Sequence, residues 1–151
     1  MNIKDRLQQV YWKFFGPYRK LRRISGGRYR EWPDIVPPFR IQIDQVEHTI
    51  EGLAEDETSP WIYKEVLIDD DYGVWKLSQR RFQPKLILDL GANVGIFSSL
   101  AKIVFPHAEV IAYEGDSRPL VPLQKNAEKY GFTVENRFVS NLEKARVSYG
   151  E

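Results

Sequence analysis

The sequence predicts an α/β fold, because segments typical of strands and of helices alternate along its second half. An apolar run over 85–90 precedes a glycine-containing turn and a helical pattern over 94–104, and a second apolar run covers 109–113. This order is typical of two parallel strands joined by a right-handed helical crossover. Beyond it the sequence predicts a helix over 117–130 and strand-like segments at 132–140 and 145–149.

The predicted helix over 117–130 has recognisable ends. Ser117 is a candidate N-cap, because its side-chain oxygen can accept a free backbone N–H. Pro119 is tolerated in a first turn, and Gly131 stands where helices commonly end.

Composition bounds the class of protein. The chain has 151 residues, of which 42% are hydrophobic, and this is enough for one compact domain. It contains no cysteine, which excludes disulfides and thiolate metal sites and fits a reducing compartment. It also has no run of about 18 apolar residues and no apolar signal core at its start. We therefore expect a cytoplasmic protein without a metal site, peripheral at a membrane if its first residues bind one.

Residues 1–32 are predicted to form a basic amphipathic helical arm. Apolar residues recur at helical spacing, and Gly16-Pro17 bends the pattern. Residues 1–30 hold nine Lys and Arg against Asp5 alone. Such a patch favours an anionic membrane surface or an acidic partner protein, and we expect no nucleic acid. The alternative is that the apolar stripe is ordinary core packing and the cations are merely solvated.

Residues 33–83 are predicted to be a linker followed by short strands. A proline-rich stretch marks the linker. The carboxylates of Asp69–Asp71 are expected to form a solvated turn, because a metal loop would space its ligands around a glycine. Strand-like patterns precede them at 39–43, 46–50 and 61–68.

The segment Asp89–Gly95 lies where a buried strand turns into a helix. Gly91 and Gly95 lack a Cβ where a ligand and the helix start approach the backbone, and the helix N-terminus offers unpaired N–H groups. A dinucleotide fingerprint needs glycine where Asn93 stands. S-adenosylmethionine has no phosphate, and its sulfonium and ammonium groups suit an acidic residue, Asp89, beside this loop.

A second acid, Glu114, ends the next predicted strand, 25 residues after Asp89. In doubly wound folds an acid at this place accepts the ribose hydroxyls of a bound nucleotide. Either carboxylate alone has an equally good explanation as a turn residue. Together, at neighbouring strand ends, they favour a cofactor site.

Three stretches resemble the FkbM family of S-adenosylmethionine-dependent methyltransferases, and the similarity runs from about Ile62 to the end of the chain. They are Ile87–Ser98 (ILDLGANVGIFS), Val110–Glu114 (VIAYE) and Leu123–Asn126 (LQKN). The resemblance implies a Rossmann-like class I methyltransferase fold, with the N-terminal arm and short strands in front of it.

The resemblance also implies roles for single residues. Residues 84–151 would form a partial S-adenosylmethionine-binding domain. Its ribose would be held by Glu114, and the methionine part of the cofactor would contact Gly91, Ala92, Asn93 and Gly95.

The predicted cofactor site departs from the family pattern in two places, after Glu114 and at Asn141. Gly115 and Asp116 follow Glu114, where the family usually has proline. Asn141 stands where an aspartate usually lies beside the adenine amine. The amide oxygen of Asn141 can accept that hydrogen bond, without the charge assistance of a carboxylate.

The predicted sheet is incomplete, because the family fold continues with four more strands. The strand over 85–90 would keep an open edge, which favours self-association. The resemblance implies methylation of a hydroxyl on a sugar or another small molecule. A truncated, catalytically inactive cofactor-binding remnant or interaction module is the alternative.

No catalytic base can be assigned from the sequence. His48 and His107 are expected to be structural or exposed. Tyr72 either lines the cofactor pocket, as the resemblance implies, or packs in a turn on the core.

Overall fold

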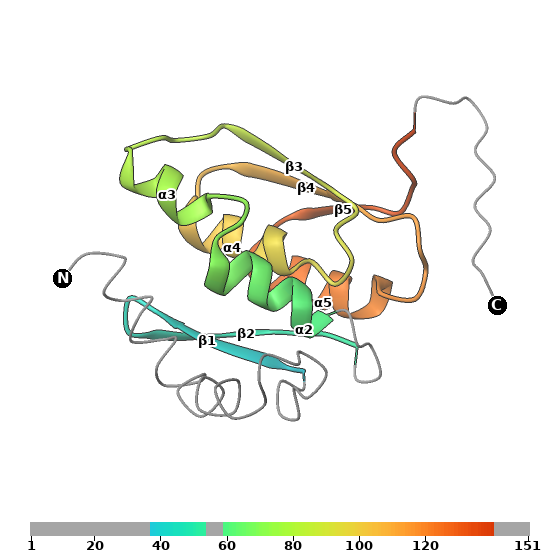
Figure 1. The fold of residues 1–151 in the computed structure, drawn as a ribbon. Helices are drawn as coiled ribbons and strands as arrows, with labels where there is room; N and C mark the ends of the chain where they lie inside the picture. Colours follow the sequence, from blue (N-terminus) through green and yellow to red (C-terminus); the bar gives the residue numbers. More distant parts are fainter. Residues whose placement is uncertain (1–36, 54–58, 141–151) are drawn as a thin grey trace, which may run out of the picture.

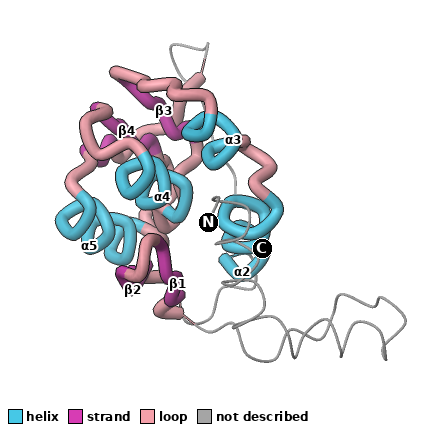
Figure 2. The backbone as a smooth tube through the Cα atoms, turned by 90° about the vertical axis from the view of Figure 1, so that its left-hand side faces the viewer, coloured by secondary structure: helices cyan, strands magenta, loops and turns pink. Residues whose placement is uncertain are grey.

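The computed structural model describes residues 37–53 and 59–140, which form an α/β structure. Figure 1 shows three layers, in which helices lie between a three-stranded sheet and a two-stranded hairpin. The same order of layers is visible after a quarter turn in Figure 2. The α/β fold class predicted from the sequence is confirmed.

The hairpin consists of β1 (Phe39–Ile43) and β2 (Val46–Ile50), which pair antiparallel with Phe39 opposite Ile50. Asp44 and Gln45 connect the strands with φ values of 49° and 69°. Two central residues with positive φ form the turn whose twist suits a hairpin. Both strands predicted from the sequence are confirmed, and their buried residues are Phe39, Ile41 and Ile50.

The strand predicted over 61–68 is wrong, because this segment is helical. It lies within α2 (Ser59–Tyr63) and the π-helical segment η1 (Lys64–Asp69), which precede α3 (Val74–Gln79). Its aromatic and β-branched residues suit a strand locally. Packing overrides this preference, because the residues spaced as on one helix face are buried in the core: Tyr63, Val66 and Leu67.

The acidic run Asp69–Asp71 ends η1 at Asp69 and enters the predicted turn before α3 with Asp70 and Asp71. Asp70 does more than face solvent. Its two carboxylate oxygens accept the backbone N–H groups of Trp75 and Lys76, at 3.1 and 3.2 Å. Asp70 thereby satisfies free donors in the first turn of α3.

The second sheet contains β3 (Leu86–Leu90), β4 (Glu109–Tyr113) and β5 (Thr133–Glu135). The strands are parallel in the order β3-β4-β5. The helix α4 (Ile96–Val104) connects the first two strands and α5 (Leu120–Tyr130) connects the last two. The predicted strand–helix–strand unit is confirmed.

The ends of the last two elements differ from the prediction. The N-cap of α5 is Pro119, with no side-chain cap, so the predicted Ser117 cap is wrong. Ser117 contributes its backbone carbonyl instead, which accepts the Leu120 N–H. Gly131 ends the helix as predicted. The strand expected over 132–140 is reduced to β5, and the segment 145–149 lies outside the described residues.

The parallel sheet has one covered face. Val110 and Ala112 on β4 are buried against the helices, within a core that also includes Leu100 and Leu123. On the other face, the outer side chains of the edge strand β3 are about half exposed: Leu86, Leu88 and Leu90. Self-association through this edge stays a prediction. Within the described part of the chain, no helix is long and apolar enough to cross a membrane.

Candidate functional site

The predicted cofactor loop and Glu114 lie side by side at the carboxyl ends of two strands. The register places Leu90 of β3 opposite Tyr113 of β4, so the segments that follow both strands start at the same edge. The N–H groups of Gly91 and Ala92 both donate to the Tyr113 carbonyl, at 2.9 Å. The loop is therefore anchored to the end of β4.

The carboxylate of Glu114 braces the loop. Its Oε2 accepts the Asn93 N–H at 2.8 Å, and its Oε1 accepts the Asp116 N–H at 2.7 Å. The Glu114 backbone is held by Glu135, whose carbonyl accepts its N–H, and by the side chain of Asn136. A carboxylate offers about four lone-pair positions, so each oxygen retains an acceptor position for a ligand.

Asp89 is the second acid at this edge. Its side chain points to the first turn of α4, where Ser98 Oγ donates to Asp89 Oδ2 at 2.6 Å. Burial raises the pKa of Asp89, the Ser98 hydrogen bonds oppose that rise, and the charge of Glu114 adds to it. The two carboxylates therefore repel each other across neighbouring strand ends.

Asn93 carries a buried acceptor. Its backbone is left-handed, with a φ of 50°, a conformation that asparagine adopts more readily than most residues. Its side-chain Oδ1 is buried without a hydrogen-bond partner among the described residues. Such groups are rare in folded proteins. The atom is therefore a candidate acceptor for a ligand N–H.

The two glycines of the loop meet different surroundings. Both have positive φ, 85° at Gly91 and 81° at Gly95. A Cβ at Gly91 would have nothing within 4 Å, whereas one at Gly95 would lie 2.7 Å from Leu123 and 3.0 Å from Phe132. Gly91 therefore leaves open space at the strand end, and Gly95 permits close packing of α4 against α5 and the segment after it.

Substitution of the two glycines should separate these effects. Gly91→Ala is expected to cost about 1–2 kcal/mol, the cost of a left-handed backbone alone. Gly95→Ala adds overpacking of about 1–3 kcal/mol, so we expect a total of roughly 2–5 kcal/mol. Urea unfolding of both variants measures the difference. Equal destabilisation would contradict the structural role of Gly95.

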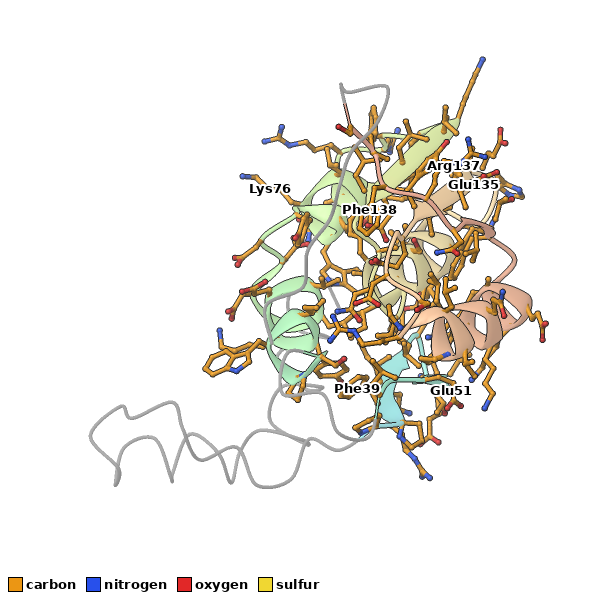
Figure 3. All side chains as sticks on the ribbon, turned by 90° about the vertical axis from the view of Figure 1, so that its right-hand side faces the viewer. Phe39, Glu51, Lys76, Glu135, Arg137 and Phe138 are labelled. Atoms are coloured by element: carbon orange, nitrogen blue, oxygen red, sulfur yellow. The ribbon has the colours of Figure 1, made fainter. Side chains whose placement is uncertain are left out.

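Phe138 is a residue at this edge that the sequence analysis missed. A Cβ on Gly115 would overlap the Phe138 ring, so the ring lies directly against the residue that follows Glu114. Phe138 is 47% exposed and follows β5, close to Glu135 and Arg137 (Figure 3). Glycine at position 115 permits this close approach, because any side chain there would overlap the Phe138 ring.

The other predicted cofactor residues contribute less to this geometry. The Asp116 carboxylate accepts the Arg118 N–H at 2.9 Å and Arg118 Nε at 2.7 Å, and these bonds lower the pKa of Asp116. Ala92 is a buried residue of the loop. Asn141 lies outside the described residues.

Three residues considered from the sequence have other surroundings. The Tyr72 ring lies 5.2 Å from the Phe97 ring on the first turn of α4. His48 packs 6.1 Å from the Tyr130 ring, and burial, followed by the charge of Lys129, lowers the pKa of His48. His107 is exposed in the turn after α4. Among the described residues, neither histidine forms a hydrogen bond or an ion pair with Asp89 or Glu114.

No family model matches this chain. The methyltransferase sdnD of Sordaria araneosa is 39% identical over 77 residues, which cover 51% of this chain and 27% of that protein. The AMB antimetabolite synthetase AmbE of Pseudomonas aeruginosa is 33% identical over 82 residues, or 54% of this chain and 4% of that protein.

A solved structure from Pyrococcus horikoshii, provisionally named an RNA methyltransferase, has a TM-score of 0.46 and 23% identity. The match covers 63% of this chain and 50% of that one. The chain thus spans only part of each curated relative, 27% of sdnD and 4% of AmbE. About half of this chain is similar in sequence to a methyltransferase.

Proposed function

We propose that this chain carries the S-adenosylmethionine-binding part of an FkbM-like methyltransferase. The proposal rests on Asp89 and Glu114, which lie at the ends of neighbouring parallel strands and flank one glycine-containing loop. Ligands of open α/β sheets bind outside the carboxyl ends of the strands. Similarity to a methyltransferase over 51% of the chain supports methyl transfer as the chemistry.

The groups at this edge suit the chemistry of that cofactor. Each oxygen of Glu114 accepts one backbone N–H and retains a lone pair that can accept a ribose hydroxyl. The cofactor's ammonium group needs acceptors. The Asp89 carboxylate is one, and Asn93 Oδ1, which has no hydrogen-bond partner within the described part of the chain, is another. The open space beside Gly91 allows a ligand to approach the backbone.

S-adenosylmethionine supplies an electrophilic methyl group when it is bound, and the protein then aligns the acceptor with it. In this chain, Glu114 would bind the ribose, and the loop from Gly91 to Gly95 would bind the methionine end together with Asp89. Asn141 would bind the adenine amine. As the acceptor we propose a hydroxyl of a sugar or of another small molecule, on the strength of the FkbM resemblance.

Isothermal titration of the chain with S-adenosylmethionine and S-adenosylhomocysteine tests the proposal. We expect dissociation constants in the micromolar range, and no heat with NAD⁺, because Asn93 replaces the glycine that lets a pyrophosphate approach. A folded chain that binds neither sulfur compound, or that binds NAD⁺ equally well, would contradict the proposal. Binding without methyl transfer to any hydroxyl acceptor would favour the alternative of an inactive cofactor-binding module.

A further inference from the structure

One face of α5 holds the end of the β1–β2 hairpin. Lys129 Nζ and Tyr130 Oη each donate a hydrogen bond to the Thr49 carbonyl, both at 2.7 Å. One turn earlier, Asn126 Oδ1 accepts the Glu51 N–H at 2.8 Å, and Asn126 Nδ2 donates to the Glu51 carbonyl at 3.0 Å. Residues three and four apart share a helix face. Figure 3 labels Glu51 where the hairpin meets α5.

Asn126 makes a third contact, and it reaches the candidate cofactor loop. Its Nδ2 also donates to the Val94 carbonyl at 2.7 Å. Both Asn126 and Val94 are fully buried. A single amide therefore joins three segments that are far apart in the sequence: the end of the hairpin, the loop after β3, and α5.

We propose that Asn126 is a positioning residue that transmits the placement of the hairpin to the loop over 91–95. The inference rests on the proposed function, since the ligand of that loop is the proposed cofactor. Val94 lies between Asn93, whose N–H binds Glu114, and Gly95, after which α4 begins. A shift of the Val94 carbonyl therefore moves the backbone on both sides of Val94, at Asn93 and at Gly95. In a buried, low-dielectric position such hydrogen bonds are strong and costly to leave unmade.

A matched pair of variants tests this link. Asn126→Ala and Tyr130→Phe each remove hydrogen bonds from α5 to the hairpin, but only Asn126→Ala removes the bond to the loop. In NMR spectra of the ligand-free chain, the amide signals of Asn93 and Gly95 should move in Asn126→Ala and stay in place in Tyr130→Phe. Affinity for S-adenosylhomocysteine should fall about 10-fold in Asn126→Ala and less than about 2-fold in Tyr130→Phe.

The two readouts separate this inference from the proposed function. Loop amides that move equally in both variants, or that do not move in Asn126→Ala, would overturn the inference. If the wild-type chain binds no S-adenosylhomocysteine, the proposed function fails. Loop amides that move only in Asn126→Ala would then still support the positional link.

Asn126→Ala removes three hydrogen bonds of a buried side chain, so a measurement on the wild-type chain accompanies it. Coupling between the hairpin and the loop is reciprocal. Bound S-adenosylhomocysteine should therefore slow hydrogen exchange at the Glu51 amide, whose acceptor is Asn126. The Phe105 amide, at the far end of α4, serves as the reference and should not change. Slowing that is equal at both amides, or absent at Glu51 in a chain that binds the ligand, would overturn the inference.

Discussion

Replacing Glu114 with alanine is expected to lower the affinity for S-adenosylhomocysteine by roughly 100-fold or more. Each hydrogen bond from a ribose hydroxyl to a charged group contributes about 1.5–3 kcal/mol, and two such bonds would be lost. The substitution also removes the acceptor of the Asn93 and Asp116 N–H groups. We therefore expect destabilisation of about 1–3 kcal/mol as well. Calorimetric titration below the unfolding temperature measures the first effect, and thermal unfolding measures the second.

Two further variants identify the cause of the loss. Glu114→Gln keeps one oxygen acceptor but turns an NH₂ group toward a backbone N–H, so the affinity should fall less, by about 10-fold. Glu109 is the matched control, because it is an exposed glutamate at the opposite end of the same strand. Glu109→Ala should leave the affinity unchanged. Wild-type affinity in a folded Glu114→Ala chain would exclude Glu114 from the cofactor site.

Local sequence pattern was sufficient to locate the acids and the loop of the candidate site. A strand, a glycine-containing turn and a helix occur in that order around Asp89, and the parallel pairing of β3 with β4 brings Glu114 to the same edge. The positions of the two acids in the sequence placed them at adjacent strand ends. Their carboxylates in turn predicted a ligand with a cationic group or with hydroxyl groups. The location of the two acids was predictable because the carboxyl ends of neighbouring parallel strands lie at the same edge of a sheet.

Long-range contacts of the site could not be predicted in the same way. Asn126 lies 75 residues from Glu51 and 32 from Val94, and nothing in the sequence pairs these positions. The contact of Phe138 with Gly115 likewise depends on the path of the chain after β5. Such contacts are set by tertiary packing. The local hydrophobic pattern of a single sequence does not indicate which distant residues will meet.

The fold was predictable in segments whose hydrophobic residues repeat as in a strand or as in a helix. It was not predictable where tertiary packing overrode the secondary-structure propensity of the residues. The segments 39–43 and 46–50 alternate well enough to predict two short strands, and both form the hairpin, in which Ile41 and Ile50 are buried. The segment containing Val66 carries residues that favour strands, yet it packs as a helix against α4. β-Propensity depends strongly on context, and here the buried face of a helix was more favourable.

Asp89→Asn is expected to stabilise the chain at neutral pH while weakening cofactor binding. Burial is the largest cause that raises the pKa of Asp89 above its ordinary value of 3.8, and the Glu114 charge adds to it, so folding disfavours the ionised carboxylate. Asparagine has nearly the same shape, and its Oδ1 can still accept the Ser98 hydroxyl. Removing the charge should increase the free energy of unfolding by on the order of 1 kcal/mol.

The pH dependence of the gain distinguishes this explanation from a packing effect. Because the folded-state pKa of Asp89 is raised, the cost of its charge is fully present above that pKa and disappears as the pH falls below the ordinary value of 3.8. The difference in unfolding free energy between Asp89→Asn and wild type should therefore be largest at neutral pH and should approach zero in acid. Asp71 lies in the exposed turn before α3 and serves as the control. Asp71→Asn should not increase the free energy of unfolding at neutral pH.

Binding should change in the opposite direction from stability. A neutral amide offers the ammonium group of S-adenosylmethionine no opposite charge, so the affinity of Asp89→Asn should fall about 10-fold, as expected for the loss of one charge-assisted hydrogen bond. If Asp89→Asn is more stable than wild type and binds less well, the Asp89 charge destabilises the wild-type chain and contributes to ligand binding. If Asp89→Asn instead unfolds more readily at neutral pH and binds as the wild type does, the Asp89–Ser98 bond serves the fold, and the ligand's cationic end lies elsewhere.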